Sequence, residues 1–318
     1  MARRRTHNRS EEADIRFLMK HPWLIAALAA VLLICAFFYL IPQWQAAPTV
    51  SASPTAVKTT VQNRDELTVH MIDVGQGDAT LIRQGDAAML IDAGTAESGD
   101  KVVAYLKQQG IKRLDIVIAT HAHADHIGGM TRVLKSFRVD TFLIKFMPEG
   151  YTPTIASYER MLNTLIDKGV SVREAAPGDT YRLGDATVRI VGPARDFEDM
   201  NDQSVVCRVT YGQRRFLFQG DAETPAENAI LDSGQAIAAD VLKVGHHGSS
   251  TSTMKAYLQA VDPSIALISC GKDNDYGHPH QETLQKLKTQ KAAVYRTDQS
   301  GTVVVHTDGK TLTVTTEK

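Results

Sequence analysis

A single short segment, residues 120–129, carries four potential metal ligands within six positions, namely His121, His123, Asp125 and His126. The apolar residues directly before it predict a buried strand, and two glycines follow it. Neutral imidazole and carboxylate are ligands that suit Zn²⁺ and neighbouring first-row ions. The segment therefore predicts a metal site at the end of a strand. Its first two histidines can face one side of an extended turn, and the aspartate and third histidine can reach a second ion.

The composition is that of a folded protein without a disulfide framework. Apolar residues make up 43% of the 318 residues and charged residues 22%, so the length allows one large domain or two small ones. Three cysteines, Cys35, Cys207 and Cys270, are too few and too scattered for a set of disulfides. Cys207 lies in a strand-like stretch and is expected to be a small buried side chain. Cys270 precedes Gly271 at a strand end, but we do not expect it to be a metal ligand.

The N-terminal part has the pattern of a membrane anchor. Residues 1–20 are polar and basic, and residues 23–41 form a run of nineteen residues without a charge. At 1.5 Å per residue, such a helix is close to the thickness of a bilayer core. Aromatic residues near both ends suit the interface, and the basic residues before the run place the N-terminus in the cytoplasm. We therefore predict a cytoplasmic segment at 1–21 and a single transmembrane anchor at 22–41, with the remainder outside the cytoplasm.

Two other interpretations of the apolar run are weaker. A cleaved signal peptide usually has a shorter apolar region and a small-residue cleavage site, whereas the candidate site at Ala46-Ala47 precedes Pro48. A lipoprotein would use Cys35, but this cysteine lies in the middle of the run and follows the bulky Ile34. An uncleaved anchor in the cell membrane accounts for the pattern better than either.

Residues 42–65 predict a flexible linker, because they are rich in Ala, Thr, Ser, Val and Pro and show no periodicity. The folded domain is then expected at residues 66–318. This domain holds 27 basic and 32 acidic side chains, a net charge of −5. A protein that grips long nucleic acid through its phosphates needs a broad basic surface, which this balance does not predict. Two divalent ions would add positive charge at one point only.

Strand-like and helical segments alternate within the domain. Strands are predicted at residues 67–72, 79–83, 89–91, 114–119, 141–144, 188–191, 205–209, 215–219, 241–244, 265–269, 302–306 and 311–315. Helices are predicted at residues 100–109, 130–137 and 154–168, with further helices before the strands at 241 and 265. This order predicts two sheets packed face to face with helices outside, and a site along one edge of the sandwich.

Polar residues follow buried strands at three further points, which are Asp221, the pair His246-His247, and His278. With the first segment they make eight ligand-type side chains, and six or seven of them are enough for two ions that share one carboxylate. Asp221 is the natural bridge, because it stands alone at a strand end after Gly220. By contrast, we expect His70 to be a strand residue and not a ligand.

At this point the sequence resembles a known family. The run His-x-His-x-Asp-His at 121–126 looks like the signature of the metallo-β-lactamase fold. Residues 73–78 (Asp-Val-Gly-Gln-Gly-Asp), Gly220-Asp221 and residues 243–249 (Lys-Val-Gly-His-His-Gly-Ser) are similar to its ComEC-like branch, the soluble domain associated with the DNA-uptake channel. The resemblance covers about residues 66–318. Since only one candidate membrane segment accompanies it, the transport role is not carried over.

The resemblance implies a four-layer αββα sandwich that holds two divalent metal ions, Zn²⁺ or Mn²⁺. It implies that His121 and His123 hold the first ion, that Asp125, His126 and the distal His278 hold the second, and that Asp221 bridges them.

One part of the family pattern is missing. Most members have another histidine between the first motif and the bridging aspartate, where this sequence reads Asn-Asp-Gln-Ser at 201–204. Asp202 or Asn201 would take that place, or alternatively the first ion would use His246 or His247.

The implied chemistry is hydrolysis, because two cations lower the pKa of a bridging water from 15.7 toward ~7 and stabilise a developing oxyanion. Asp125 or Asp221 would hold the water or take its proton. Asp78 and Asp92 are either groups that orient the histidines or ordinary turn aspartates. Ser249 and Ser250, together with Thr251, are either a phosphate-binding group or the N-cap of a following helix.

The function expected first is that of a membrane-anchored extracytoplasmic phosphodiesterase of nuclease type, acting on DNA ends. A second possibility is an envelope phosphodiester such as a teichoic-acid polymer, and a third is a lactone, ester, lactam or thioester. A reading of a different class is a non-catalytic, tethered metal-binding scaffold. Metal content combined with hydrolysis of bis(p-nitrophenyl) phosphate separates these possibilities, whereas the oligomeric state is not indicated by the sequence.

Overall fold

The structure, a computed structural model, describes residues 66–147 and 150–318. The basic segment, membrane anchor and linker predicted at 1–21, 22–41 and 42–65 lie outside these residues. Within the described ranges, no helix has both the length and the apolar character needed to cross a bilayer.

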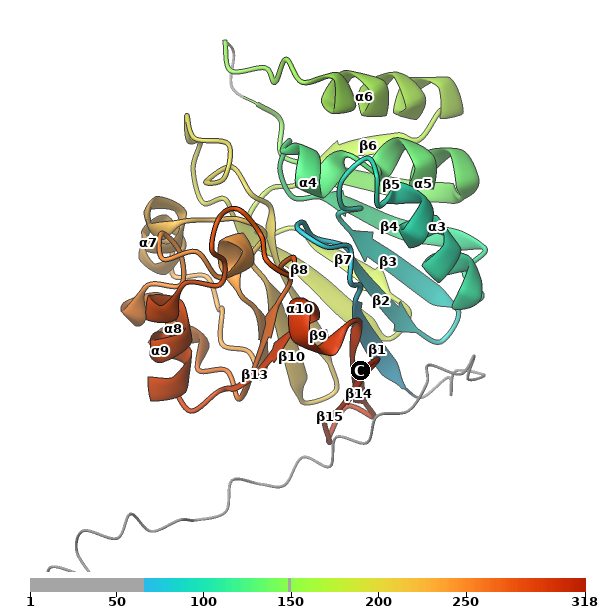
Figure 1. Ribbon diagram of the computed structural model, residues 1–318. Coiled ribbons are helices and arrows are strands. Elements are labelled where there is room, and N and C mark those ends of the chain that lie inside the picture. The colour runs from blue at the N-terminus through green and yellow to red at the C-terminus, as the bar shows by residue number, and fades with distance from the viewer. Residues whose placement is uncertain (1–65, 148–149) are drawn as a thin grey trace, which may run out of the picture. The chain divides into compact units, whose positions relative to one another are not determined.

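Two mixed sheets form the centre of the domain (Figure 1). The first has the strand order β15-β14-β1-β2-β3-β4-β5-β6, formed by Leu67–Met71 (β1), Thr80–Gln84 (β2), Ala87–Ile91 (β3), Arg113–Ala119 (β4), Arg138–Ile144 (β5), Ser171–Glu174 (β6), Val303–Thr307 (β14) and Thr313–Thr316 (β15). The second has the order β13-β12-β11-β10-β9-β8-β7, formed by Thr180–Leu183 (β7), Ala186–Gly192 (β8), Val206–Tyr211 (β9), Arg214–Phe218 (β10), Val241–Lys243 (β11), Ile265–Ile268 (β12) and Ala293–Arg296 (β13). In each sheet one half is antiparallel, and the other half, β3 to β6 or β10 to β13, is parallel.

Helices cover the outer face of each sheet (Figure 1). The first sheet is covered by Gly99–Gln108 (α3), Met130–Ser136 (α5) and Ala156–Lys168 (α6), and the second by Thr224–Asp232 (α7), Lys255–Val261 (α8) and Gln281–Thr289 (α9). Shorter elements are Ala124–Ile127 (α4), the 3₁₀ turn Gly245–Gly248 (η1) and Thr297–Ser300 (α10).

Alternation along the central strands creates three separate cores. In β4, Ile116 and Ile118 point into the core between the sheets, whereas Val117 and Ala119 point toward the helices of the first sheet. Successive side chains of a strand face opposite sides, so a strand that is apolar throughout is buried on both faces. Each fully buried aliphatic side chain of this size stabilises the fold by about 1.5–3 kcal/mol. The resulting order of helices, sheet, sheet and helices is the one predicted from the strand pattern.

The strand pattern missed three strands, β6, β7 and β13. Each lies at the edge of its sheet, and most of its side chains are exposed or only partly buried. Edge strands carry polar residues and lack the continuous apolar run of a central strand. By contrast, the helix predicted at 154–168 begins at Ala156 and ends before Gly169, whose φ of 60° supplies its left-handed C-cap.

Candidate metal centre

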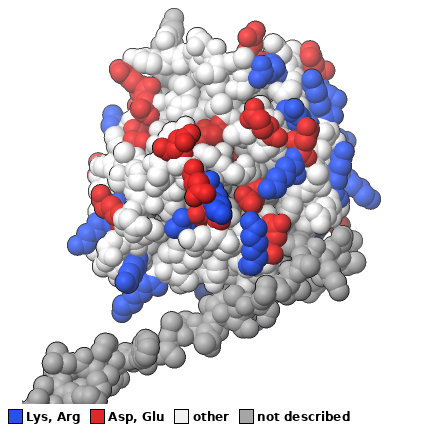
Figure 2. All heavy atoms as spheres, viewed as in Figure 1, with Lys and Arg blue, Asp and Glu red and all other residues white. Residues whose placement is uncertain are grey.

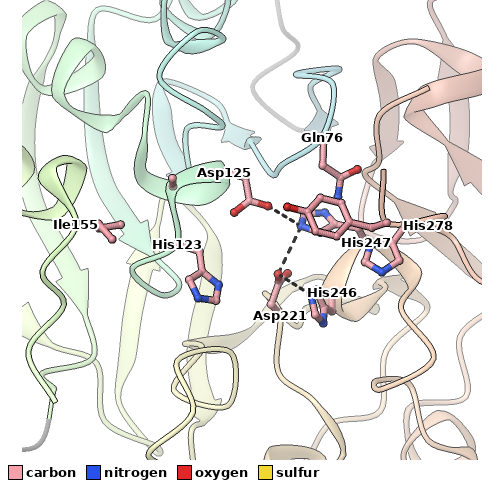
Figure 3. A pocket seen from close by; sticks show the side chains of 10 residues that line it. Gln76, His123, Asp125, Ile155, Asp221, His246, His247 and His278 are labelled. Carbon is pink, nitrogen blue, oxygen red and sulfur yellow. Dashed lines mark ion pairs between the residues drawn. The ribbon is translucent and has the colours of Figure 1, made fainter. Parts of the chain in front are cut away.

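The ligand-type side chains come from the carboxyl ends of parallel strands in both sheets. Asp92 follows β3, the segment with His121, His123, Asp125 and His126 follows β4, Asp221 follows β10, and His246 and His247 follow β11. Because the parallel halves of the two sheets end at the same edge of the sandwich, these side chains meet there. Figure 3 shows His123 and Asp125 on one side of a cavity and Asp221, His246 and His247 on the other. The cavity has a volume of about 400 Å³.

The Asp221 carboxylate lies at the centre of this group. Its Oδ2 atom is 3.1 Å from His126 Nε2, 3.4 Å from His247 Nε2, and 3.9 Å from both His121 Nε2 and His246 Nε2. The side chain is only 2% exposed. A ligand shared by two ions must lie between the two groups of ligands. The Asp221 carboxylate meets this requirement, because it faces imidazoles from both sheets.

Two sets of possible ligand atoms adjoin Asp221. His121 Nε2 is 3.0 Å from His123 Nδ1, so these two rings face one point. Ligand atoms of Asp125, His126 and His247 lie within 4.8 Å of one another and form the other set. The segment after β4 therefore supplies possible ligand atoms on two sides of Asp221, and His126 is grouped with His121 as well as with Asp125.

His247, and not the His278 that the family resemblance implies, is grouped with Asp125 and His126. Among the described residues, His278 belongs to no group of ligand atoms within 4.8 Å. It lies on the cavity wall, with its ring centroid 6.2 Å from that of His247. Burial and the neighbouring histidines 246, 247 and 280 lower the pKa of His278 to about 4, so its ring is neutral at physiological pH.

The structure does not bring Asp202 or Asn201 to the ligand group. The Asp202 carboxylate accepts hydrogen bonds from the backbone N–H groups of Glu223 and Ala226, at 3.1 and 3.2 Å. These N–H groups belong to the first turn of α7 and have no partner within the helix, which is why a carboxylate is favoured there. Asn201 donates to Glu223 instead.

Ser204 is the residue of this segment that reaches the site. Its Oγ lies 3.3 Å from His121 Nδ1 and accepts a hydrogen bond from the Asp221 backbone N–H at 3.0 Å. A serine in this position orients a ligand and does not replace the missing histidine. The sequence analysis assigned no role to Ser204, because a serine at a strand end has no specific signal.

Neither Ser249 nor Ser250 lines the cavity. The Ser249 hydroxyl is buried and forms a hydrogen bond with Thr251 Oγ1 at 2.9 Å. The Ser250 N–H donates to His280 Nδ1, also at 2.9 Å. The helix expected directly after them, α8, begins only at Lys255, so they do not stand at its N-terminus. Their local hydrogen bonds hold the loop after η1 in place.

Carboxylates and carbonyls fix the orientation of two imidazoles. Asp92 Oδ2 accepts from His126 Nδ1 at 2.8 Å, which leaves His126 Nε2 pointing at Asp221. His247 Nδ1 donates to the carbonyl of Ser269 at 2.9 Å, which leaves its Nε2 facing Asp125 and Asp221. Such contacts select the tautomer that a metal ligand needs. Of the two roles considered for Asp92, its contact with His126 supports the orienting one.

The glycine-rich loop at 73–78 packs directly against the ligand segment. The Asp78 N–H donates to the carbonyl of Asp125 at 3.1 Å. A Cβ atom on Gly77 would stand 2.3 Å from that same carbonyl oxygen, so only glycine fits there. The Gly77 carbonyl in turn accepts from the hydroxyl of Ser269 in the second sheet. The loop therefore joins the two halves of the site.

Two buried charged residues near the site had no role in the sequence analysis. Lys243 is only 4% exposed, and its ammonium pairs with the Asp78 carboxylate, donates to the Gly220 carbonyl at 2.9 Å and lies 3.8 Å from Asp221 Oδ1. A lysine within the apolar strand at 241–244 was the signal that could have identified it.

Glu227 on α7 accepts hydrogen bonds from Gln219 Nε2 and from the N–H groups of residues 253 and 254, so it links the segment before Asp221 to the loop after η1. Burial raises the pKa of Glu227 to about 7.

The electrostatic balance of the site fits divalent cations. Burial alone would lower the pKa of His126 and His247. The carboxylates of Asp221 and Asp92 instead raise the pKa of His126 well above the ordinary value, and those of Asp221, Asp78 and Asp125 do the same for His247. Burial opposes ionisation of Asp221, yet the same two histidines hold its pKa well below the usual range. His126 Nε2, His247 Nε2 and Asp221 Oδ1 are buried without a hydrogen-bond partner among the described residues. These atoms can supply the electron pairs that metal ligands in a binuclear site require. Two cations would replace the protons on the histidines.

Metal binding is expected to release protons. The raised pKa values keep His126 and His247 protonated at pH 7 in the metal-free protein, whereas a metal ligand must be neutral imidazole. Zn²⁺ added to metal-free protein should therefore release about two protons, and its apparent affinity should rise with pH up to the raised pKa values. Calorimetry in buffers of different ionisation enthalpy measures this number. Release of fewer than about one proton at pH 7 would contradict the protonated state of the pair.

Comparison with known proteins agrees with the fold. Residues 72–272 match the model of the metallo-beta-lactamase superfamily. The chain is similar to ComE operon protein 3 of Bacillus subtilis (strain 168), at 36% identity over 254 residues that cover 74% of this chain and 32% of that protein. It is also similar to competence protein ComA of Neisseria gonorrhoeae, at 29% identity over 260 residues that cover 79% of this chain and 33% of that protein.

The chain thus spans about a third of the length of these curated relatives. Among solved structures, the metallo-beta-lactamase fold protein YhfI from Bacillus subtilis superposes with a TM-score of 0.51 at 16% identity, covering 76% of this chain and 100% of that one. At this identity the likeness concerns the fold alone. Together with the His/Asp cluster at the strand ends, these matches place the chain in the metallo-β-lactamase superfamily, as a relative of the competence proteins.

Proposed function

We propose that this metallo-β-lactamase fold hydrolase is a phosphodiesterase of nuclease type. The observation that carries the proposal is the Asp221 carboxylate between ligand atoms from both sheets, at the wall of an open cavity. The proposed ligands are His121 and His123 for one ion, Asp125, His126 and His247 for the other, and Asp221 for both. Relatedness to competence proteins supports a nucleic-acid substrate.

When bound, two divalent ions supply Lewis-acid catalysis and lower the pKa of water toward neutrality. Asp125 is the ligand-type carboxylate most open to the cavity, with its side chain 31% exposed. Burial raises the pKa of Asp125, but the ion pair with His247 and the charge of His126 keep it well below its usual range. An ionised Asp125 can accept a hydrogen bond from the attacking water and orient it toward phosphorus.

His246 is placed to protonate the leaving oxygen. Its Nδ1 lies 2.8 Å from Glu223 Oε1, and this contact lowers the pKa of the Glu223 carboxyl. The ring lines the cavity, and its Nε2 is 3.9 Å from Asp221 Oδ2, beside the proposed ions. With Nδ1 held by a carboxylate, Nε2 is the atom that carries a proton to the leaving group. His246 is therefore proposed as a general acid and not as a ligand.

The surface charge favours a short or single-stranded substrate over a long duplex. Acidic and basic side chains are interspersed on the face shown in Figure 2, and residues 66–318 have a net charge of −5. Long duplexes are held mainly through many phosphate contacts with Lys and Arg. DNA ends that reach the cavity with one or a few nucleotides need fewer of these contacts.

The proposed location of the domain is the outer face of the cell membrane. The uncharged run at 23–41, with basic residues before it, supports a single anchor whose N-terminus is cytoplasmic. Protease added to intact cells should then degrade residues 66–318 while a cytoplasmic marker protein stays whole. Protection of the domain until the cells are lysed would contradict this orientation.

A substrate panel tests the proposed activity. Full-length protein loaded with Zn²⁺ or Mn²⁺ is expected to hydrolyse bis(p-nitrophenyl) phosphate and single-stranded DNA, and Asp221→Ala should abolish both activities, because it removes the shared ligand. A glycerol-phosphate polymer and a lactone complete the panel. A metal-loaded protein that is silent on phosphodiesters and active on the lactone would overturn the proposal, and an unchanged rate in Asp221→Ala would refute the bridging role.

His246→Ala tests the general acid separately. We expect a loss of about 10²–10⁴-fold in kcat on a DNA phosphodiester, whose alkoxide leaving group needs a proton. The loss should be small on bis(p-nitrophenyl) phosphate, because p-nitrophenolate leaves without protonation. Metal content serves as the control and should stay at the wild-type level. An equal loss on both substrates together with loss of one ion would show that His246 is a ligand.

A further inference from the structure

One exposed aromatic side chain stands in the proposed active site without a role in the chemistry above. Among residues 66–147 and 150–318, five large apolar side chains are exposed, namely Phe146, Tyr151, Ile166, Val172 and Tyr276. Of these five, Tyr276 alone lines the metal cavity. It is 65% exposed, which leaves most of its ring open to a ligand.

Tyr276 is the outermost of three nearly parallel rings. Its ring centroid is 5.6 Å from that of His278, with 19° between the planes. The His278 ring is in turn stacked toward His247, at 6.2 Å and 26°. Offset stacking at such separations is a favourable arrangement of aromatic rings. The rings therefore form a stack that runs from the cavity mouth to a proposed metal ligand.

The loop that carries Tyr276 is held firmly in place. Asn274 bonds to both of its ends, because its Nδ2 donates to the carbonyls of Gly271 and His278, at 2.9 and 2.6 Å. Its Oδ1 accepts from the His278 N–H at 3.0 Å. The Tyr276 carbonyl is bonded to His280 Nε2 at 3.2 Å. The exposed ring is therefore presented in a defined position, so little conformational entropy is lost when a ligand stacks on it.

We propose that Tyr276 and His278 form a stacking platform for one nucleobase of the substrate, next to the phosphate that is cleaved. The proposal rests on the phosphodiesterase function proposed above and names its substrate class as single-stranded nucleic acid. Every nucleobase has a flat π face, and aromatic platforms bind such faces without strong sequence preference. A base can stack on a side chain only when it is not paired and stacked within a duplex.

Size and charge favour the same class of ligand. A cavity of about 400 Å³ matches a single nucleotide better than a double helix. The net charge of −5 in residues 66–318 weakens binding through phosphates, so base stacking must supply a larger share of the affinity. A glycerol-phosphate polymer of the cell envelope has no π face and would gain little from Tyr276.

The experiment compares two substrates in matched variants of the full-length protein. The substrates are a hexathymidylate and the same strand with abasic nucleotides at all positions except the labelled end. Tyr276→Ala should raise KM on hexathymidylate on the order of tenfold with kcat nearly unchanged, and should leave KM on the abasic strand unchanged. Tyr276→Phe keeps the stacking ring and should behave as the wild type. Tyr151→Ala, which removes an exposed tyrosine outside the cavity lining, is the matched control.

Binding gives a second measurement that does not depend on turnover. Fluorescence anisotropy of both strands, measured in the Asp221→Ala background, should show the same loss on the order of tenfold for Tyr276→Ala and only for hexathymidylate. Equal behaviour of the two strands, or an equal loss in Tyr151→Ala, would overturn the platform. If the wild type cleaves no phosphodiester, the proposed function fails, and the anisotropy comparison still decides the platform. A Tyr276-dependent KM on a glycerol-phosphate polymer would also overturn it.

Discussion

The site depends on the burial of one carboxylate, that of Asp221, at the junction of the two sheets. A buried charge is destabilising by several kcal/mol unless other groups compensate it. Here the compensation comes from His126 and His247 and from Lys243 beside Oδ1. His126 comes from the first sheet, whereas Lys243 and His247 come from the second. The carboxylate can therefore be buried only when the two sheets are packed correctly against each other.

Packing between the layers of the fold holds the two sheets in position around Asp221. The core between the sheets holds β4 of one sheet against β10 and β11 of the other, through side chains such as Ile118, Phe216 and Val241. The loop at 73–78 adds a direct link, since it contacts Asp125 on one side and Ser269 on the other. Helix α7 contributes from outside, where Glu227 links Gln219 to the loop after η1. A packing defect in any of these places would change ligand geometry rather than remove a ligand.

Most of the central architecture was predictable from local pattern, whereas the edges and the final ligand assignment were not. Central strands such as β4 are apolar throughout because they are buried on both faces, and this makes them visible in a sequence. The edge strands β6, β7 and β13 are only four residues long and mostly exposed or partly buried, so no such signal exists. Asp202 was considered as a ligand because of its place in the chain, but the free N–H groups of α7 bind its carboxylate instead. That competition arises only once α7 is packed beside it.

The order of residues alone predicts a metal site at 121–126 and indicates the superfamily, because a His-x-His-x-Asp-His segment after an apolar strand concentrates possible metal ligands at one point. It also indicated that Asp221 stands apart as a single carboxylate at a strand end. Which of the remaining histidines adjoins Asp125 depends on the packing of the two sheets, in which His247 Nε2 lies 3.2 Å from Asp125 Oδ2. Spacing along the chain cannot rank these histidines, because an imidazole has the same chemistry at each position. Their distances to Asp221 are set by how β10, β11 and β12 pair and by the turn after β11, where His246 and His247 both adopt positive φ.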